Sequence, residues 1–287
     1  MKVKHLSIDD SAYPSELRTI SAPPKQLYYL GCDPTEWLVR PRVAVVGSRS
    51  VTPYGKQVTT QLVTELVSRG ITIVSGLALG VDTVAHTAAT AVSGGHIAIL
   101  AHGLDKIYPA SNTQLARKLL SQGGVLISEY PEGTPSFKQH FVARNRIVAG
   151  LADALLIVEA GEKSGTLHTA RFALEQGGDV LAVPGNITSP TSVGCNNLIK
   201  SGATPVTCVD DILHVLNLDS LSTTKQVYHG DTPEEQIILD SLYQGISDGH
   251  ALLITSGQDA ERFAQTLTIL ELSGKIRPLG NNHWAPR

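Results

Sequence analysis

The chain of 287 residues is 42% hydrophobic and 17% charged, which suits a folded protein with a sizeable core and excludes wholesale disorder. Its length allows one large domain and one small one. The formal net charge of −3 excludes the uniformly basic surface that many nucleic-acid-binding proteins carry, so any such site would have to be a local cluster of cations.

Hydropathy and cysteine usage bear on the compartment. The sequence contains no apolar run of bilayer length, and its first residues lead quickly into polar ones, so we expect neither a membrane span nor a secretory signal. The three cysteines, Cys32, Cys195 and Cys208, are odd in number and lack paired metal spacing. We therefore expect a cytoplasmic protein without a disulfide framework, a metal site or a cofactor.

Residues 1–40 are rich in proline and aromatic residues and lack clear periodicity, and we expect them to form a partly ordered segment packed on the main domain. From Arg42 onward, short apolar runs alternate with helical patterns. The expected strands lie at 43–46, 71–74, 97–100, 125–127, 154–158 and 180–183, and the expected helices at 53–70, 82–91, 112–122, 164–176 and 196–201, with a further run at 205–209. This alternation predicts βαβ units and a doubly wound, mostly parallel sheet over residues 41–216.

The composition changes after about Leu216. Residues 217–232 include a polar stretch without an apolar face, which is typical of a linker. Beyond it, Pro233 opens a helical pattern, a second helical pattern covers 259–273, and the last residues resemble a short hairpin. This order predicts a small winged-helix-like domain at 233–287.

Two loops that follow buried strands carry phosphate-binding chemistry. In the first, Gly47 lets the backbone approach a ligand, Ser48 offers a hydroxyl near a helix start, and Arg49 adds a bidentate fork. The second loop opens a helix and contains Lys163, Ser164, Gly165 and Thr166. Neither loop matches the dinucleotide fingerprint or the Walker A order, so ATP hydrolysis is not supported.

A third loop contains Ser75, Gly76 and Gly80, and it leads into a helix that carries Asp82 and His86. The glycines indicate unusual backbone angles or close approach. The i,i+4 spacing of Asp82 and His86 allows an acid–base pair. The alternative, which we favour, is that Asp82 serves as a cap or first-turn carboxylate and that His86 is hydrogen-bonded near it.

Two further motifs lie near strand ends. Arg144 and Arg146 flank Asn145, and because they are two residues apart they would diverge on a helix, so that one could face a ligand while the other anchors the fold. Pro184 and Gly185 form a turn after the sixth strand, and we expect this turn to shape the same crevice from another side.

Taken together, these motifs closely resemble the DprA/Smf family of DNA-processing proteins. The resemblance depends on the ordered set GSR (47–49), SGLALGVD (75–82), GLDKIYP (103–109), SEYPEG (128–133), FVARNRIVAGL (141–151), VEAGEKSGTLHTARFALEQG (158–177), VPGN (183–186) and NNLIKSGA (196–203). The resemblance covers about residues 20–285 of the chain. One departure is Val142, which stands where the family's F-P-x-R-N-R pattern has proline.

The resemblance implies an extended Rossmann-like domain that binds single-stranded DNA, helps to load the RecA recombinase in natural transformation, forms a homodimer and is not an enzyme. The residues it implies for the DNA pocket are Gly47, Ser48, Arg49, Arg144, Asn145, Arg146, Lys163, Ser164, Gly165 and Thr166. Phe137 and Phe141 are the candidates for base stacking.

Two alternatives remain open. One is a nucleotide-binding enzyme that is similar to the lysine-decarboxylase-like phosphoribohydrolases, although the double glycine of their PGGxGT loop is missing from 162–166. The other is a nucleotide sensor without affinity for DNA.

Overall fold

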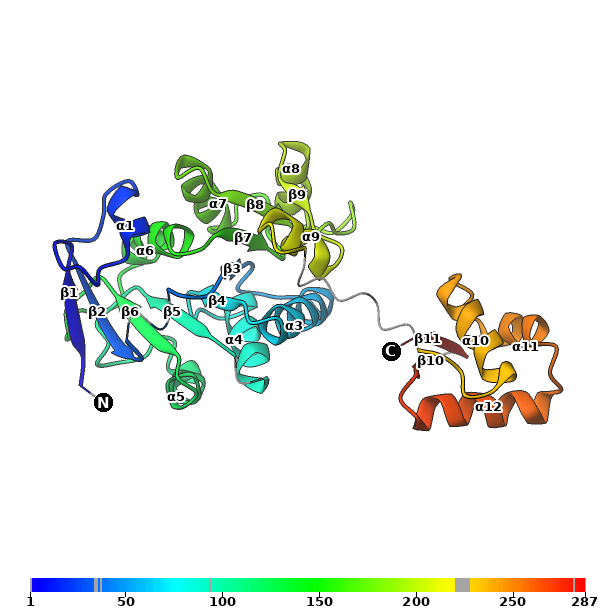
Figure 1. Ribbon diagram of the computed structural model, residues 1–287. Helices are drawn as coiled ribbons and strands as arrows, with labels where there is room; N and C mark the ends of the chain where they lie inside the picture. The colour runs from blue at the N-terminus through cyan, green and yellow to red at the C-terminus, as the bar shows by residue number, and fades with distance from the viewer. Residues whose placement is uncertain are drawn as a thin grey trace. The chain divides into compact units, whose positions relative to one another are not determined.

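The computed structural model describes residues 2–33, 36, 38–92, 94–219, 228–280 and 282–286. The chain divides into two compact units, Met1–Ser222 and Thr223–Arg287 (Figure 1). The first unit holds the motifs that the sequence singled out.

The first unit is built on a nine-stranded sheet in the order β1-β2-β6-β5-β4-β3-β7-β8-β9. The strands are β1 (Lys4–Ser7), β2 (Gln26–Gly31), β3 (Arg42–Val46), β4 (Thr72–Ser75), β5 (His96–Leu100), β6 (Val125–Ser128), β7 (Ala154–Ile157), β8 (Asp179–Ala182) and β9 (Thr204–Pro205). All pairs from β6 to β9 are parallel, while β1–β2 and β2–β6 are antiparallel. The expected α/β class with a mostly parallel sheet is therefore confirmed.

The parallel part of the sheet is wound in two directions from its centre. From β3 the chain adds β4, β5 and β6 on one side, and it then returns to add β7, β8 and β9 on the other. The order reverses between β3 and β7. In open α/β sheets the connecting loops separate at such a point, which leaves a crevice at the carboxyl ends of the strands.

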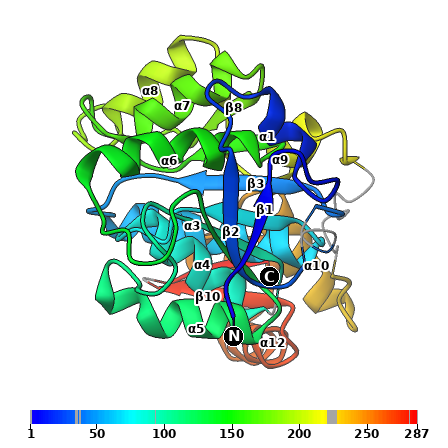
Figure 2. The same ribbon diagram turned by 90° about the vertical axis from the view of Figure 1, so that its left-hand side faces the viewer.

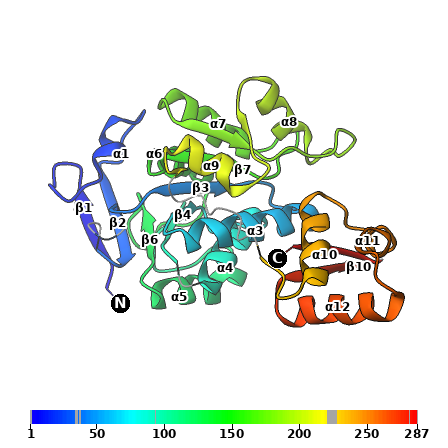
Figure 3. The ribbon, with the colours of Figure 1, turned by 45° about the vertical axis from the view of Figure 1, so that its right-hand side comes forward.

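Helices cover both faces of this sheet. They are α1 (Ser15–Thr19), α3 (Pro53–Ser68), α4 (Val81–Ala91), α5 (Thr113–Ser121), α6 (Lys138–Gly150), α7 (Thr166–Glu175), α8 (Val193–Lys200) and α9 (Val209–Val215). Figures 1 and 3 show α3, α4 and α5 on one face and α6 and α7 on the other. The strands between them are buried on both faces, which is why they read as continuous apolar runs.

The N-terminal segment, which we expected to be only partly ordered, supplies two strands of the sheet. Figure 2 views this end of the unit, with β1 and β2 in front. Leu17 and Leu27 are buried in the main core. The buried guanidinium of Arg42 donates to Glu16 at 2.7 Å and to Asp153 at 3.2 Å, which ties the segment to the start of β3. The irregular spacing of apolar residues concealed these strands in the sequence.

Three helices of the first unit were not anticipated, namely α1, α6 and α9. The helix α6 contains the Arg144–Arg146 motif. The expected apolar run 205–209 contains the last residue of the two-residue strand β9 and the first residue of α9. The start of α9 is stabilised by the Asp211 carboxylate, which accepts hydrogen bonds from the backbone N–H groups of Thr207 and Cys208.

The second unit contains α10 (Pro233–Tyr243), α11 (Gly249–Ser256), α12 (Ala260–Leu272) and the hairpin β10 (Ile276–Gly280) and β11 (His283–Pro286). The helix α11 was missed from the sequence. Leu239, Leu252 and Leu270 form the centre of its separate core. Of the expected linker at 217–232, residues 220–227 lie outside the described residues.

The described residues contain neither a candidate membrane span nor a candidate metal-binding cluster. None of the helices in these ranges is long and apolar enough to cross a membrane. Within the same ranges, no group of three or more His, Cys, Asp or Glu side chains is placed to hold a metal ion.

Candidate nucleic-acid interface

A hollow of about 640 Å³ lies at the carboxyl edge of the sheet, where the loops after β3 and β7 diverge. Its size is that of typical ligand pockets. The lining residues are Val46, Gly47, Ser48, Arg49, Ser50, Ala78, Asp82, Tyr108, Ser136, Lys138, Phe141, Val142, Arg144, Asn145, Ser164, Gly165, Thr166 and Thr169. We call this hollow the Arg49 pocket. It collects residues from three of the predicted loops around the reversal point of the sheet.

The loop after β3 is clamped from both sides. The Ser48 N–H donates to the Glu159 carbonyl at 2.8 Å, and the Val81 N–H donates to the Ser48 carbonyl at 3.1 Å. A Cβ on Gly47 would lie 2.6 Å from Val81 Cγ2, so only glycine fits at this position. The loop that carries Arg49 is therefore held between the end of β7 and the start of α4.

Gly80 allows the loop after β4 to pack against this first loop. Its φ of 81° lies in the left-handed region, and a Cβ there would be 2.1 Å from the Ser48 carbonyl oxygen. Gly80 thus shapes the pocket indirectly, by letting two backbones approach each other.

Arg49 lies against an aromatic pair. Its guanidinium carbon is 5.1 Å from the centroid of the Phe141 ring, and the Phe141 and Tyr108 rings are 5.8 Å apart. Arg49 is exposed, and Tyr108 is 52% exposed. The guanidinium thus keeps donors available for an anion while its flat face rests on an aromatic ring.

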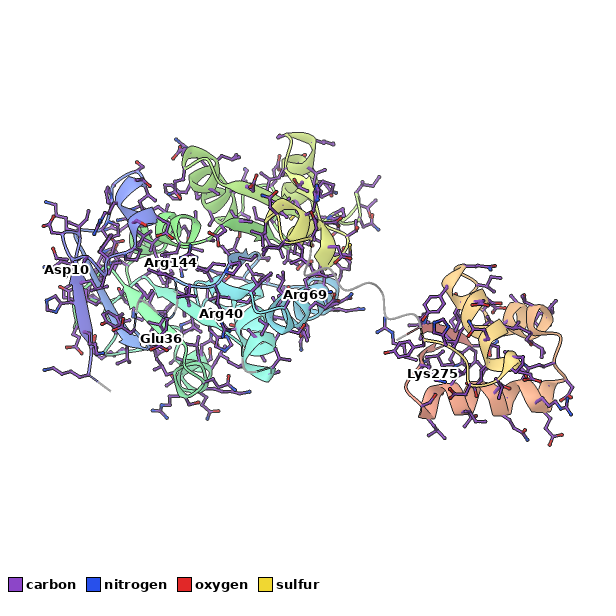
Figure 4. The ribbon with its side chains drawn as sticks, viewed as in Figure 1. Asp10, Glu36, Arg40, Arg69, Arg144 and Lys275 are labelled. Atoms are coloured by element: carbon purple, nitrogen blue, oxygen red, sulfur yellow. The ribbon has the colours of Figure 1, made fainter. Side chains whose placement is uncertain are left out.

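Arg144 is buried inside the unit (Figure 4). Its guanidinium donates to the Ile99 carbonyl and passes over Gly76, where a Cβ would collide with it. Burial lowers the pKa of Arg144, and the charge of Asp82 partly opposes this. Arg144 therefore joins α6 to the ends of β4 and β5, and it supplies positive charge to the base of the pocket.

Asp82 and His86 do not form the acid–base pair that was one alternative. The Asp82 carboxylate accepts from the backbone N–H groups of Gly76 and Ala78 at 3.0 and 3.3 Å, as a first-turn residue of α4. His86 is fully buried, and desolvation, with a smaller contribution from the charge of His96, lowers its pKa to about 3. His86 is therefore a neutral core residue.

Ser75 also serves the fold. Its buried hydroxyl donates to the Val45 carbonyl at 2.7 Å and joins β4 to β3. The lining of the Arg49 pocket does not include Ser75, Gly76, Gly80 or His86.

The two arginines of α6 diverge, as their spacing requires. Arg146 forms a two-point ion pair with Glu129, with distances of 2.8 and 2.6 Å, and its Nε donates to the Ala22 carbonyl. It ties α6 to the N-terminal segment and is outside the pocket lining, whereas Asn145 is part of that lining.

The start of α7 opens into the pocket. Ser164, Gly165 and Thr166 line it, and the first N–H groups of a helix favour an anion. Lys163 is exposed on the same loop but is not part of the lining. Lys163 directly precedes Ser164, the first residue of this loop that lines the pocket.

Pro184 and Gly185 lie elsewhere. They line a neighbouring hollow together with Thr52, Tyr54 and Glu159, instead of the Arg49 pocket. The sequence placed them on the correct edge of the sheet, but it could not separate two adjacent hollows.

The sequence reasoning also missed pocket residues, including Lys138 and Tyr108. Lys138 lies at the first position of α6, and with Phe141, Val142 and Asn145 it follows the spacing of one helix face. This periodicity was available in the sequence once 138–150 is read as a helix. Tyr108 belongs to the GLDKIYP motif but has no local signal of its own.

Comparisons with known proteins identify the relatives of this chain. A family model described as DNA recombination-mediator protein A matches residues 4–217. Protein Smf of Escherichia coli strain K12 is 45% identical over 208 residues, which cover 72% of this chain and 55% of that protein. The chain spans about half the length of this relative and of Protein Smf from Synechocystis, of which it covers 52%.

Two solved structures extend the likeness to three dimensions. DNA processing protein A from Streptococcus pneumoniae is 40% identical, with a TM-score of 0.70 over 75% of this chain and 74% of that one. DNA processing protein A from Helicobacter pylori, described for its single-stranded DNA binding mode, is 33% identical, with a TM-score of 0.67 over 75% of this chain and 97% of that one.

Proposed function

Because this chain belongs to the DprA/Smf family of DNA recombination-mediator proteins, we propose that its first unit binds single-stranded DNA in the Arg49 pocket. The observation that carries this proposal is the stacking of the Arg49 guanidinium on Phe141, at the reversal point of the sheet. This arrangement places a cation that can bind phosphate and an aromatic face that can contact a base within one hollow. Proteins that bind single strands without strict sequence preference combine these two features.

The charges of the pocket support an anionic ligand. Arg49, Lys138 and Arg144 are its cationic lining residues, and Asp82 is its buried carboxylate. The N–H groups at the start of α7 add partial positive charge. The positive field is local, which fits a protein whose formal net charge is −3. Affinity should therefore fall steeply as salt concentration rises.

The proposed role is that of a recombination mediator that protects an incoming single strand and loads RecA onto it during natural transformation. We further propose that the chain acts as a homodimer and has no catalytic activity. The second unit, with three helices followed by a hairpin, supports a winged-helix-like module. The family membership, and the description of the Helicobacter pylori relative for its single-stranded DNA binding mode, support this proposal.

A calorimetric titration tests the proposal. The full chain is titrated with an oligodeoxynucleotide and, separately, with deoxynucleoside monophosphates. We expect tight, salt-sensitive binding of the oligonucleotide and at least about a hundredfold weaker binding of each monophosphate, because one monophosphate cannot occupy several subsites. Equal affinities for both ligands would instead support a nucleotide sensor.

The enzymatic alternative has its own test. Incubation of the full chain with nucleoside monophosphates should release no free base above a protein-free control. Release of base would support the phosphoribohydrolase alternative and contradict the proposed lack of catalysis.

A further inference from the structure

A second hollow of about 640 Å³ lies beside the Arg49 pocket, at the carboxyl ends of β7 and β8. We call it the Glu159 pocket. It is lined by Thr52, Tyr54, Glu159, Pro184, Gly185, Asn186, Ser189 and Ser192. The DNA contacts proposed for the Arg49 pocket do not use these residues.

Glu159 gives the pocket an acceptor and a negative charge. The residue is 2% exposed, and its carboxylate accepts from the Thr52 N–H at 2.9 Å, from the Thr52 hydroxyl, and from the Thr191 hydroxyl at a long 3.4 Å. A carboxylate has about four acceptor positions, so these three bonds do not use its full capacity. Gly55 must be glycine, because a Cβ there would lie 2.3 Å from Glu159 Oε2.

Ser192 adds a hydroxyl without a partner. The residue is 5% exposed, and its Oγ has no side-chain hydrogen bond within the described residues, yet this oxygen is not among their fully buried unpartnered atoms and so stays accessible from the pocket. A Cβ on Gly185 would lie 2.2 Å from this oxygen, so the glycine leaves it room. A hydroxyl that is accessible on a pocket wall can accept an N–H group of a ligand that enters the pocket.

The remaining walls restrict the class of ligand. The lining contains no lysine or arginine, so a phosphate would meet the Glu159 charge without compensation. The Tyr54 hydroxyl is occupied by the Pro184 carbonyl at 2.7 Å, which leaves its ring and the proline as apolar walls. A flat, uncharged ring that carries N–H donors suits such a site, and nucleobases have this chemistry.

The two hollows are joined by the loop between β3 and α3. The Ser48 N–H, on the Arg49 side, donates to the backbone carbonyl of Glu159. Thr52, on the other side, is only four residues farther along the chain, at most about 14 Å. Neighbouring nucleotides of one strand can cover this separation.

We propose that the Glu159 pocket receives one base of the bound strand and prefers bases with an amino group over thymine. This inference rests on the proposed function. Guanine, adenine and cytosine present N–H donors to the carboxylate, whereas thymine has one ring N–H between two carbonyl oxygens that the carboxylate repels. Such a contact gives single-strand binding a base preference that phosphate contacts cannot supply.

Fluorescence anisotropy of the full chain tests this inference. The probes are an oligonucleotide of thymidine alone and strands of equal length with one deoxyguanosine, deoxyadenosine or deoxycytidine placed at successive positions. At one position we expect the amino-bearing base to tighten binding by about fivefold or more. Ser192→Val should abolish this difference and leave thymidine-strand affinity within about twofold. The matched control, Ser121→Val, changes an exposed serine at the end of α5 and should preserve the preference.

The exposed lining residue Asn186 provides a second variant if Ser192→Val does not fold, since Asn186→Ala should also reduce the preference. Normal thymidine-strand binding with equal affinity for all probes would overturn the inference and leave the proposed function standing. A preference that persists in both variants would overturn it as well. Tight, Ser192-dependent binding of deoxyguanosine monophosphate alone would assign the pocket to a free nucleotide. Absence of binding to every strand would contradict the proposed function itself.

Discussion

Replacing Arg144 by methionine should destabilise the first unit strongly. The guanidinium is 4% exposed, donates to the Ile99 carbonyl, and partly neutralises the buried Asp82 carboxylate. Removing a buried cation that compensates the charge of a nearby buried carboxylate costs about 3–5 kcal/mol when the two form an ion pair; Arg144 and Asp82 interact only electrostatically, so we expect a loss at the lower end, about 3 kcal/mol. For a unit of this length, it corresponds to a fall in melting temperature of roughly 6–12 °C.

Differential scanning calorimetry of the full chain would measure this change in the transition of the first unit. The double variant Arg144→Met/Asp82→Asn should recover part of the loss, because it no longer buries an uncompensated carboxylate. Burial raises the pKa of Asp82, so protonation should make the destabilisation smaller at low pH than at pH 8. A single variant that melts within about 2 °C of the wild type would refute this account of the buried pair.

Three further predictions concern residues around the pocket. The pKa of His86 is lowered from 6.5 to about 3, so the free energy of unfolding should fall as pH drops below 6.5, by about 2 kcal/mol at pH 5. The variant His86→Leu should lack this part of the acid sensitivity when stability is measured by denaturant titration at several pH values. Gly80→Ala should weaken strand binding, whereas Gly133→Ala, which also has a positive φ but no atom in the way, should affect only stability; equal effects on binding would contradict the packing argument. Arg146→Met should lower the free energy of unfolding by about 1–3 kcal/mol through loss of the Glu129 pair, and with it the melting temperature, while strand affinity measured by anisotropy stays near that of the wild type.

The central architecture was predictable because buried parallel strands leave a strong pattern. Runs such as 97–100 and 154–158 are apolar on both faces, and glycine-bearing loops follow the strands at 43–46 and 71–74. The N-terminal strands were not predictable in this way. They are antiparallel, and Arg42 fixes their segment through contacts with distant residues.

The site was predictable to the level of loops but not of individual roles. The i,i+2 spacing of Arg144 and Arg146 indicated that they diverge, yet burial of the first and the Glu129 pairing of the second depend on tertiary contacts. Lys138 escaped notice because the helix that presents it was not expected. Which residues share a hollow is decided by packing between loops, which leaves no local pattern.

The most direct test of single-strand binding in the Arg49 pocket is a charge reversal at its rim. Anisotropy titrations with a labelled oligonucleotide at two salt concentrations would compare Arg49→Glu with Arg117→Glu, an exposed position on α5 outside the pocket. We predict that Arg49→Glu, and to a similar degree Lys163→Glu, weakens binding by about tenfold or more and reduces the salt slope by about 0.7 per lost phosphate contact. Arg117→Glu should behave as the wild type. Unchanged affinity in both the Arg49 and Lys163 variants would contradict the assignment of this pocket.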